Sequence, residues 1–221
     1  MTRSVLGWWF AASDTLPNGD GRKVVVGETL AVKGPPVCCE HGLHASRSIL
    51  DALAYAPGPW IYRVRLSGDI VEDEDKLAAT ERTALWCIDG TRVLREFAAT
   101  VARGALMAER RVGREPHPDS WHAVKVALAF ARGEATEEER EAAESTAWSA
   151  ARSAARSAAR SAAGSAAWSA ARSAAWSAAR SAAWSAAWSA AGSAARRAAR
   201  ARSATKLARM VMKEHRKGGS R

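Results

Sequence analysis

The feature that most constrains this chain is a four-residue repeat that runs from Trp148 to Arg200. Every fourth residue is Trp, Arg or Gly, and the triplet between them is almost always Ser-Ala-Ala. Ala is the best helix former and Ser costs only about half a kcal/mol more, so the repeat predicts helix. A helix turns about 100° per residue, so a four-residue step overshoots one turn by about 40°. The large residues therefore wind around the helix and form no fixed apolar face.

The Trp residues of such a helix need to be covered. Repeats of seven residues coil helices to the left and repeats of eleven coil them gently to the right, and a repeat of four lies beyond both. Either a partner wraps steeply around the helix, or the segment breaks at Gly164 and Gly192 into shorter helices that pack on each other. We expect self-packing, a partner or a ligand, because the aromatic surface is otherwise exposed. The alternative is a tolerated helical spacer in which the order of Trp and Arg carries no information.

Positive charge is concentrated in the same half of the chain. The sequence has 33 Lys and Arg against 23 Asp and Glu, and from Ser145 onward Glu214 is the only acidic residue. This asymmetry favours a polyanionic partner, nucleic acid first among them, although a merely soluble cationic helix has the same composition. Arg side chains would neutralise phosphates and Trp side chains would stack on unpaired bases. The predicted nucleic-acid or partner-binding residues are Arg152, Arg156, Arg160, Trp168, Arg172, Trp176, Arg180, Trp184, Trp188, Arg196, Arg197 and Arg200.

Cysteine usage and hydropathy indicate the compartment. The three cysteines, Cys38, Cys39 and Cys87, include an adjacent pair and make a poor disulfide framework, which fits a reducing cytoplasm. No segment reaches the roughly 20 uncharged apolar residues that a membrane span needs. Cys38 and Cys39 with His41 and His44 lack the CxxC spacing of zinc sites, so no metal site is predicted. We expect a cytoplasmic protein without a membrane or metal partner.

Residues before the repeat alternate between strand and helix patterns. Ser46 or Ser48 can cap a helix over Ile49–Tyr55, and Thr91 can cap a helix that runs to about Arg110. Asp119 or Ser120 begins a further helix. The predicted strands are Val5–Ala12, Lys23–Val26, Val37–Cys39, Trp60–Leu66 with its continuation Asp69–Val71, and Leu77–Ile88.

A capping box at Thr136–Glu139 predicts the start of the helical tail. The chain is therefore expected to be α+β, with a small mixed α/β head followed by a long Ala/Ser/Arg/Trp-rich helical repeat. The expected parts are an α+β head at 1–112, a loop and connecting helix at 113–133, a helical repeat tail at 134–217, and a flexible end at 218–221.

One stretch of the head resembles a known enzyme fold. Residues 42–46 (Gly-Leu-His-Ala-Ser), then Ser48 and Tyr55, then the strand 61–71, look like the middle of the poly-ADP-ribose-polymerase-like ADP-ribosyltransferase fold. That family has a Gly-x-Tyr-Phe-Ala strand, a Ser-x-x-x-Tyr helix and a strand ending in Leu-Gly-Glu-Val. Residues 81–94 are similar to its catalytic-glutamate strand and the following helix. The match covers about a quarter of the chain.

The resemblance implies NAD as the cofactor and names four residues. Glu81 would be the catalytic carboxylate that stabilises an oxocarbenium-like transition state, and His44 would contact the nicotinamide ring as a catalytic or cofactor-binding residue. Ser48 and Tyr55 would complete the cofactor site. The first strand lacks the His-Gly of that family, and His44 stands where Tyr is usual, which favours binding over catalysis. Glu81 has a second interpretation as a solvent-facing residue that pairs with an Arg such as Arg63 or Arg65. Tyr55 and Trp60 can likewise be interpreted as core residues.

The head also looks like an uncharacterised domain common in actinobacterial phages and prophages, often followed by Ala-rich repeats. A phage-encoded protein would be found in the host cytoplasm or the virion. Three functions follow. The first, which we favour over an enzyme, is a head that is a binding module or lapsed transferase, followed by a basic helical tail that self-associates or binds a partner. The second is an NAD-dependent ADP-ribosyltransferase-like enzyme, and the third is nucleic-acid binding through the Arg/Trp tail.

Overall fold

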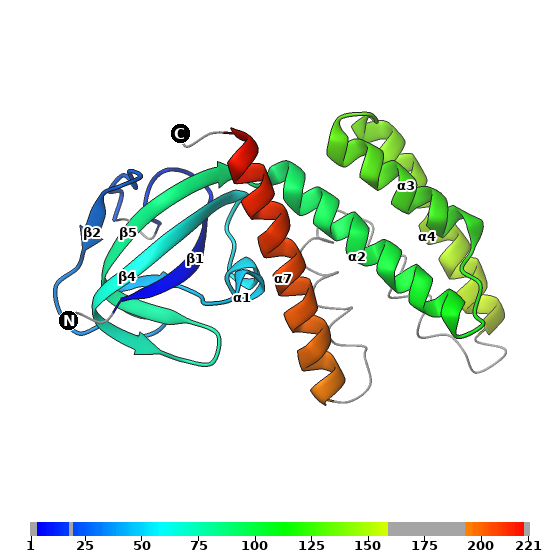
Figure 1. Ribbon diagram of the computed structural model, residues 1–221. Coiled ribbons are helices and arrows are strands. Elements are labelled where there is room, and N and C mark those ends of the chain that lie inside the picture. The colour runs from blue at the N-terminus through cyan, green and yellow to red at the C-terminus, as the bar shows by residue number, and fades with distance from the viewer. Residues whose placement is uncertain (1–3, 18–19, 159–192, 219–221) are drawn as a thin grey trace. The chain divides into compact units, whose positions relative to one another are not determined.

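The computed structural model describes residues 4–17, 20–158 and 193–218. These residues form one antiparallel sheet of five strands and five α-helices, which confirms the α+β class. The chain divides into two compact units, one of residues 1–91 with 204–221, the other of residues 92–203. Figure 1 shows the sheet of the first unit and the helices of the second.

The sheet of the first unit is built on its longest hairpin. Strands β4 (Trp60–Glu72) and β5 (Leu77–Asp89) pair antiparallel, and β1 (Val5–Ala11) lies on the free edge of β4. Strands β2 (Thr29–Ala31) and β3 (Leu43–Ala45) follow each other along the other edge of β5. The backbones of Trp8 and Ser46 exchange two hydrogen bonds of 2.7 and 2.9 Å. This bridge joins the end of β3 to β1, so the sheet curls around its core.

Two of the predicted strands were wrong. Lys23 and Val26 take part only in isolated bridges, and the strand of this region begins at Thr29, after a turn through Gly27 at φ 90°. Val37 bridges His41 in a tight turn, and Cys39 adopts the left-handed conformation at φ 72°, which ends any extended run. In both places turn geometry overrides the strand propensity of valine and cysteine.

The core of the curled sheet is apolar. Helix α1 (Ile49–Ala54) buries four of its six residues. Tyr55 and Trp60 were predicted as core residues in one interpretation, but their side chains are 51% and 39% exposed, because Tyr55 lies just past the end of α1 and Trp60 opens β4 after a Pro-Gly-Pro turn. The buried residues that share this core are Val5, Ala11, Leu16, Val24, Leu43, Ala45, Tyr62, Val64, Leu66, Leu77, Ala79 and Ala84.

The C-terminal part of helix α7 (Ser193–Gly218) belongs to the first unit. Leu207 and Val211 are fully buried, and they lie on the same face of α7 as His215. The ring of His215 stacks on that of Trp86 of β5, with the centroids 4.3 Å apart and the planes 12° from parallel. The red end of α7 therefore lies beside β5, as Figure 1 shows.

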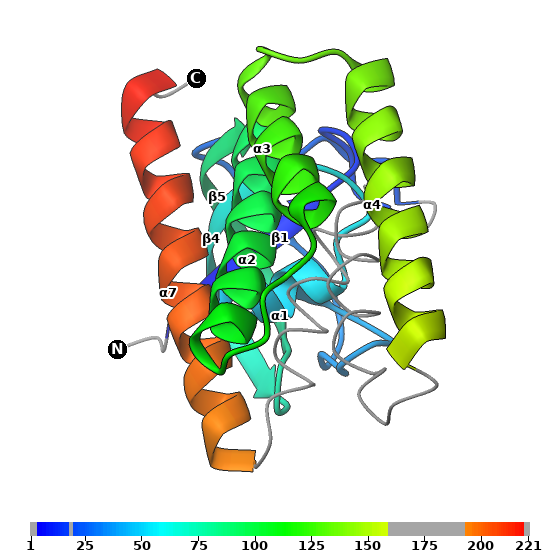
Figure 2. The same ribbon diagram turned by 90° about the vertical axis from the view of Figure 1, so that its right-hand side faces the viewer.

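Helices α2 (Thr91–Arg111), α3 (Pro118–Arg132) and α4 (Glu137–Ala158) pack in the second unit, and Figure 2 shows α3 and α4 side by side. The predicted capping box is confirmed, because the Thr136 backbone N–H donates to the Glu139 carboxylate and the Glu139 N–H donates to the Thr136 hydroxyl. The predicted start of α3 was wrong by one or two residues. His117 is the N-cap, since its ring nitrogen Nδ1 accepts from the Asp119 N–H and Pro118 suits the first helical turn.

The repeat lies mostly outside the described residues. Helix α4 runs to Ala158 and α7 begins at Ser193, so residues 159–192 are not described. Whether the tail is one helix or several stays a prediction. Among the residues that are described, no helix is long and apolar enough to cross a membrane.

Candidate functional site

His44, the middle residue of β3, accepts one hydrogen bond on its ring and one on its backbone carbonyl oxygen. Its Nε2 accepts a hydrogen bond of 3.0 Å from the backbone N–H of Cys39, so Nε2 is unprotonated. Burial lowers the pKa of His44, which keeps the ring neutral near pH 7. Its carbonyl oxygen accepts a bond of 2.8 Å from the Arg82 guanidinium. The ring thus holds the turn around Cys39 in place.

A chain of polar contacts leads from this turn to Tyr55. The Nζ of Lys76 lies 2.9 Å from the Cys39 sulfur and 4.0 Å from the centroid of the Tyr55 ring. The Tyr55 hydroxyl donates to the Asp75 carboxylate at 2.6 Å, and that bond raises the pKa of Tyr55. The structure therefore connects the predicted residues His44 and Tyr55 through Cys39 and Lys76. Sequence reasoning missed Lys76, which has no neighbour in the sequence that marks it.

Glu81 and Ser48 are not part of the chain of polar contacts that links His44 to Tyr55. The Glu81 carboxylate accepts a 2.8 Å bond from the hydroxyl of Ser67, its cross-strand partner on β4. Ser48 is the N-cap of α1 and makes no capping bond with its side chain. Within the described residues, no hydrogen bond or ion pair joins Glu81 to His44, Ser48 or Tyr55. The role of these four residues in NAD chemistry stays a prediction.

The second interpretation of Glu81 named Arg63 and Arg65 as partners. Arg63 instead donates to the Gly7 carbonyl at 3.0 Å and lies over the Trp8 ring, 4.6 Å from its centroid. In the described part of the chain, no ion pair joins Glu81 to Arg63 or Arg65.

Arg82 is a second charged residue that sequence reasoning missed. It follows Glu81 on β5, lies opposite Leu66 and Leu30, and is only 3% exposed. Its guanidinium carbon lies 3.9 Å from the centroid of the Trp9 ring. A signal existed in the sequence: in an alternating strand Arg82 shares a face with the buried Ala84, which places a charge on the apolar side.

Helix α7 carries a stripe of cations on its exposed side. At 100° per residue, five basic residues fall within an arc of about 80° along about 21 Å of helix. All five are exposed, and within the described residues none of them forms an ion pair with a carboxylate. Glu214, the one acid in α7, lies off this arc and pairs with Lys217 at 3.6 Å. The basic stripe consists of Arg202, Lys206, Arg209, Lys213 and Arg216.

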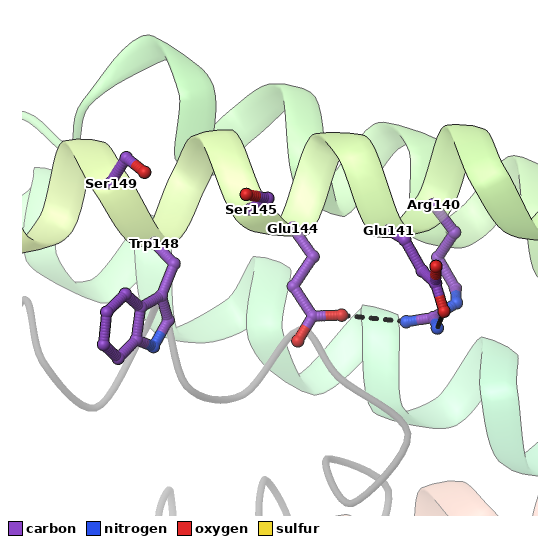
Figure 3. A pocket seen from close by; sticks show the side chains of 6 residues that line it. All are labelled: Arg140, Glu141, Glu144, Ser145, Trp148 and Ser149. Atoms are coloured by element: carbon purple, nitrogen blue, oxygen red, sulfur yellow. Dashed lines mark hydrogen bonds and ion pairs between the residues drawn. The ribbon is translucent and has the colours of Figure 1, made fainter.

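A shallow hollow on α4 offers less. Figure 3 shows that it is lined by Arg140, Glu141, Glu144, Ser145, Trp148 and Ser149. The Arg140 guanidinium binds Glu144 at 2.9 Å and also contacts Glu137 and Glu141. Because its one cation is already paired with three acids, the hollow offers no unpaired positive charge to an anionic ligand.

The predicted tail residues are only partly placed. Arg152 and Arg156 belong to α4, and Arg196, Arg197 and Arg200 belong to the first half of α7. The predicted residues outside the described ranges are Arg160, Trp168, Arg172, Trp176, Arg180, Trp184 and Trp188.

Among the described His, Cys, Asp and Glu side chains, no group of three or more is arranged to hold a metal ion.

Comparison with known proteins finds a family match for one part of the chain. Residues 18–96 match the family described as "Domain of unknown function (DUF7666)", so the matched part includes His44, Tyr55, Glu81 and Arg82 but neither β1 nor α7. No curated protein matches the chain significantly. No solved structure matches it either.

Proposed function

We propose that this protein is a non-enzymatic binding protein that docks on the phosphate backbone of a nucleic acid through the basic stripe of α7. The observation that supports this proposal is the alignment of five exposed cations on one face of a helix, none of which pairs with a carboxylate of the described residues. Each strand of duplex DNA carries one phosphate per about 3.4 Å of duplex axis, so about 21 Å of protein helix can contact several of them.

The buried face of α7 argues against a membrane as the partner. Amphipathic helices bind lipid by burying their apolar face in the headgroup region. Here Leu207 and Val211 are already buried, on the side of α7 opposite the basic stripe. The stripe therefore offers charge without the apolar residues that lipid insertion needs.

Charge in the rest of the tail supports the same partner. The predicted residues Arg197 and Arg200 precede the stripe on α7, and further Arg residues and the Trp residues of the repeat lie before them in the sequence. Aromatic rings interleaved with Arg suit single-stranded nucleic acid, where bases stack on the rings. Recognition of phosphates alone predicts binding without sequence preference.

Binding of the full chain to labelled single-stranded and double-stranded DNA and RNA over a salt series tests the proposal. The test variant replaces Lys206, Arg209 and Lys213 with Gln. Log affinity falls with log salt by about 0.9 per neutralised phosphate on duplex DNA and about 0.7 on single strands. We expect the variant to bind more weakly and its slope to be about 2 to 3 units shallower.

A matched control removes the same charge elsewhere. Lys23, Lys33 and Arg103 are exposed and lie outside α7, so their replacement with Gln should leave the salt slope unchanged. Equal binding by the stripe variant and the wild type would refute the role of α7. Binding to anionic phospholipid vesicles or to acidic proteins, but not to nucleic acid, would assign the stripe to another partner and overturn the proposal.

A further inference from the structure

Arg82 places a positive charge inside the first unit without a carboxylate to balance it. One terminal nitrogen, Nη1, donates to the His44 carbonyl at 2.8 Å. The other, Nη2, is buried and has no hydrogen-bond partner among the described residues. Burial lowers the pKa of Arg82 to about 9, so the group is still charged at neutral pH.

The titratable neighbours of Arg82 do not neutralise it. Burial raises the pKa of Tyr62, and it raises that of Cys87 to about 11, so both are uncharged near pH 7. Asp20 lies close enough to interact with Arg82, but both of its carboxylate oxygens are bound by Arg22, at 2.7 and 2.8 Å. The charge of Arg82 is therefore left for something outside these side chains.

Such an arrangement is costly. A buried charge that lacks a partner destabilises a fold by several kcal/mol, and most buried N–H groups are paired. A water molecule could accept from Nη2, but it would leave the charge unbalanced. An anion would satisfy both the donor and the charge. The observations thus favour a negatively charged occupant.

We propose that Arg82 is the anchor of a binding site for a small oxyanion, a carboxylate or phosphate group, which accepts hydrogen bonds from Nη2. Trp9 and the His44 carbonyl hold the guanidinium in position from two sides, at 3.9 and 2.8 Å. The ring of Trp9, over which the guanidinium lies, is itself only partly buried. The ligand is a free anion or the charged end of a larger molecule.

Anion-dependent stability of the full chain tests this site. The thermal unfolding midpoint is measured with increasing acetate, or with increasing inorganic phosphate, at constant ionic strength. A ligand that binds only the folded state raises the midpoint with the logarithm of its concentration. For at least one of the two anions we expect this rise in the midpoint and a saturable change in the tryptophan fluorescence of the folded chain, since Trp9 lies against Arg82. A response to acetate indicates a carboxylate ligand, and a response to phosphate indicates a phosphate ligand.

The variant Arg82→Met should lose the effect. Because an apolar side chain of similar size removes a buried charge, the variant should fold at least as stably without anion. Arg65→Met removes an exposed Arg from the neighbouring strand and should respond as the wild type does. Arg82→Lys keeps the charge but loses the forked guanidinium, so we expect it to bind the anion at least tenfold more weakly. This variant serves as the test if Arg82→Met fails to fold.

Three results would overturn this proposal. No saturable response to either anion in the wild type would leave Arg82 without a ligand. An unchanged response in Arg82→Met, or in Arg82→Lys where Arg82→Met does not fold, would place the anion elsewhere. The third result concerns Asp20→Asn. If this variant were less stable, if added anion did not restore its stability, and if the loss disappeared when Arg82→Met was also present, Asp20 would be the counter-ion of Arg82. The Gln variant of the basic stripe should bind the anion normally, so this site stands or falls independently of nucleic-acid binding.

Discussion

Truncation of Leu207 measures how much the buried face of α7 contributes to stability. Leu207 is fully buried on the face of α7 that carries His215, and His215 stacks on Trp86 of the sheet. Replacing a buried Leu with Ala removes its transfer free energy and leaves a cavity, at a cost of about 3 kcal/mol. Stabilities of domains are about 5 to 15 kcal/mol, so Leu207→Ala should remove a large share. The thermal midpoint of a unit of this size should fall by roughly 12 to 24 °C.

The assay is urea unfolding followed by near-ultraviolet circular dichroism, which reports the packing of the aromatic side chains, Trp86 among them. Met212→Ala is the matched control, because Met212 is 36% exposed on the same helix and Ala supports helix at least as well as Leu or Met. We expect a change of less than about 1 kcal/mol in the control. If Leu207→Ala and Met212→Ala shifted the unfolding midpoint equally, α7 would not be docked through this face.

Three further predictions concern single residues. Thr136→Ala removes the capping box of α4, so the helix should lose about 1 kcal/mol, measured as the free energy of unfolding. Burial lowers the pKa of His44 below its ordinary value of 6.5, so the unfolded state takes up a proton first as the pH falls below 6.5. Stability should therefore decline through that range, and His44→Gln should flatten the decline measured by urea unfolding at several pH values. We expect no NAD hydrolysis by the full chain, and hydrolysis that disappears in Glu81→Gln would instead support the transferase resemblance.

The long elements of the fold could be predicted from the sequence because their signals are local. The strand at Leu77–Ile88 is one residue shorter than β5, and the helix from Thr91 to about Arg110 agrees with α2. The capping box at Thr136 is a four-residue pattern that needs no tertiary contact. Short strands failed for the opposite reason: β2 has three residues, and only its pairing with β5 makes it a strand.

The candidate sites depended on contacts that the sequence does not show. The alternation of β5 places Arg82 on the apolar face, but its unbalanced charge also follows from the capture of Asp20 by Arg22, which no pattern in the sequence shows. Likewise, Lys76 reaches Cys39 across 37 residues of chain. The resemblance to a transferase named His44 and Tyr55, and the structure joins them through Lys76 and Cys39 rather than through Glu81.

Helix α7 separates two properties on its two faces. One face carries the buried Leu207 and Val211 and the ring of His215, which stacks on Trp86, and the basic stripe lies about 180° away. Substitution of the stripe should therefore change nucleic-acid binding without changing stability, whereas Leu207→Ala should change stability without removing any charge. The four-residue period of the repeat predicts no such division, because in a helix it would wind the Trp and Arg residues around the axis. The sequence therefore predicts that a fixed basic stripe begins only where the repeat ends.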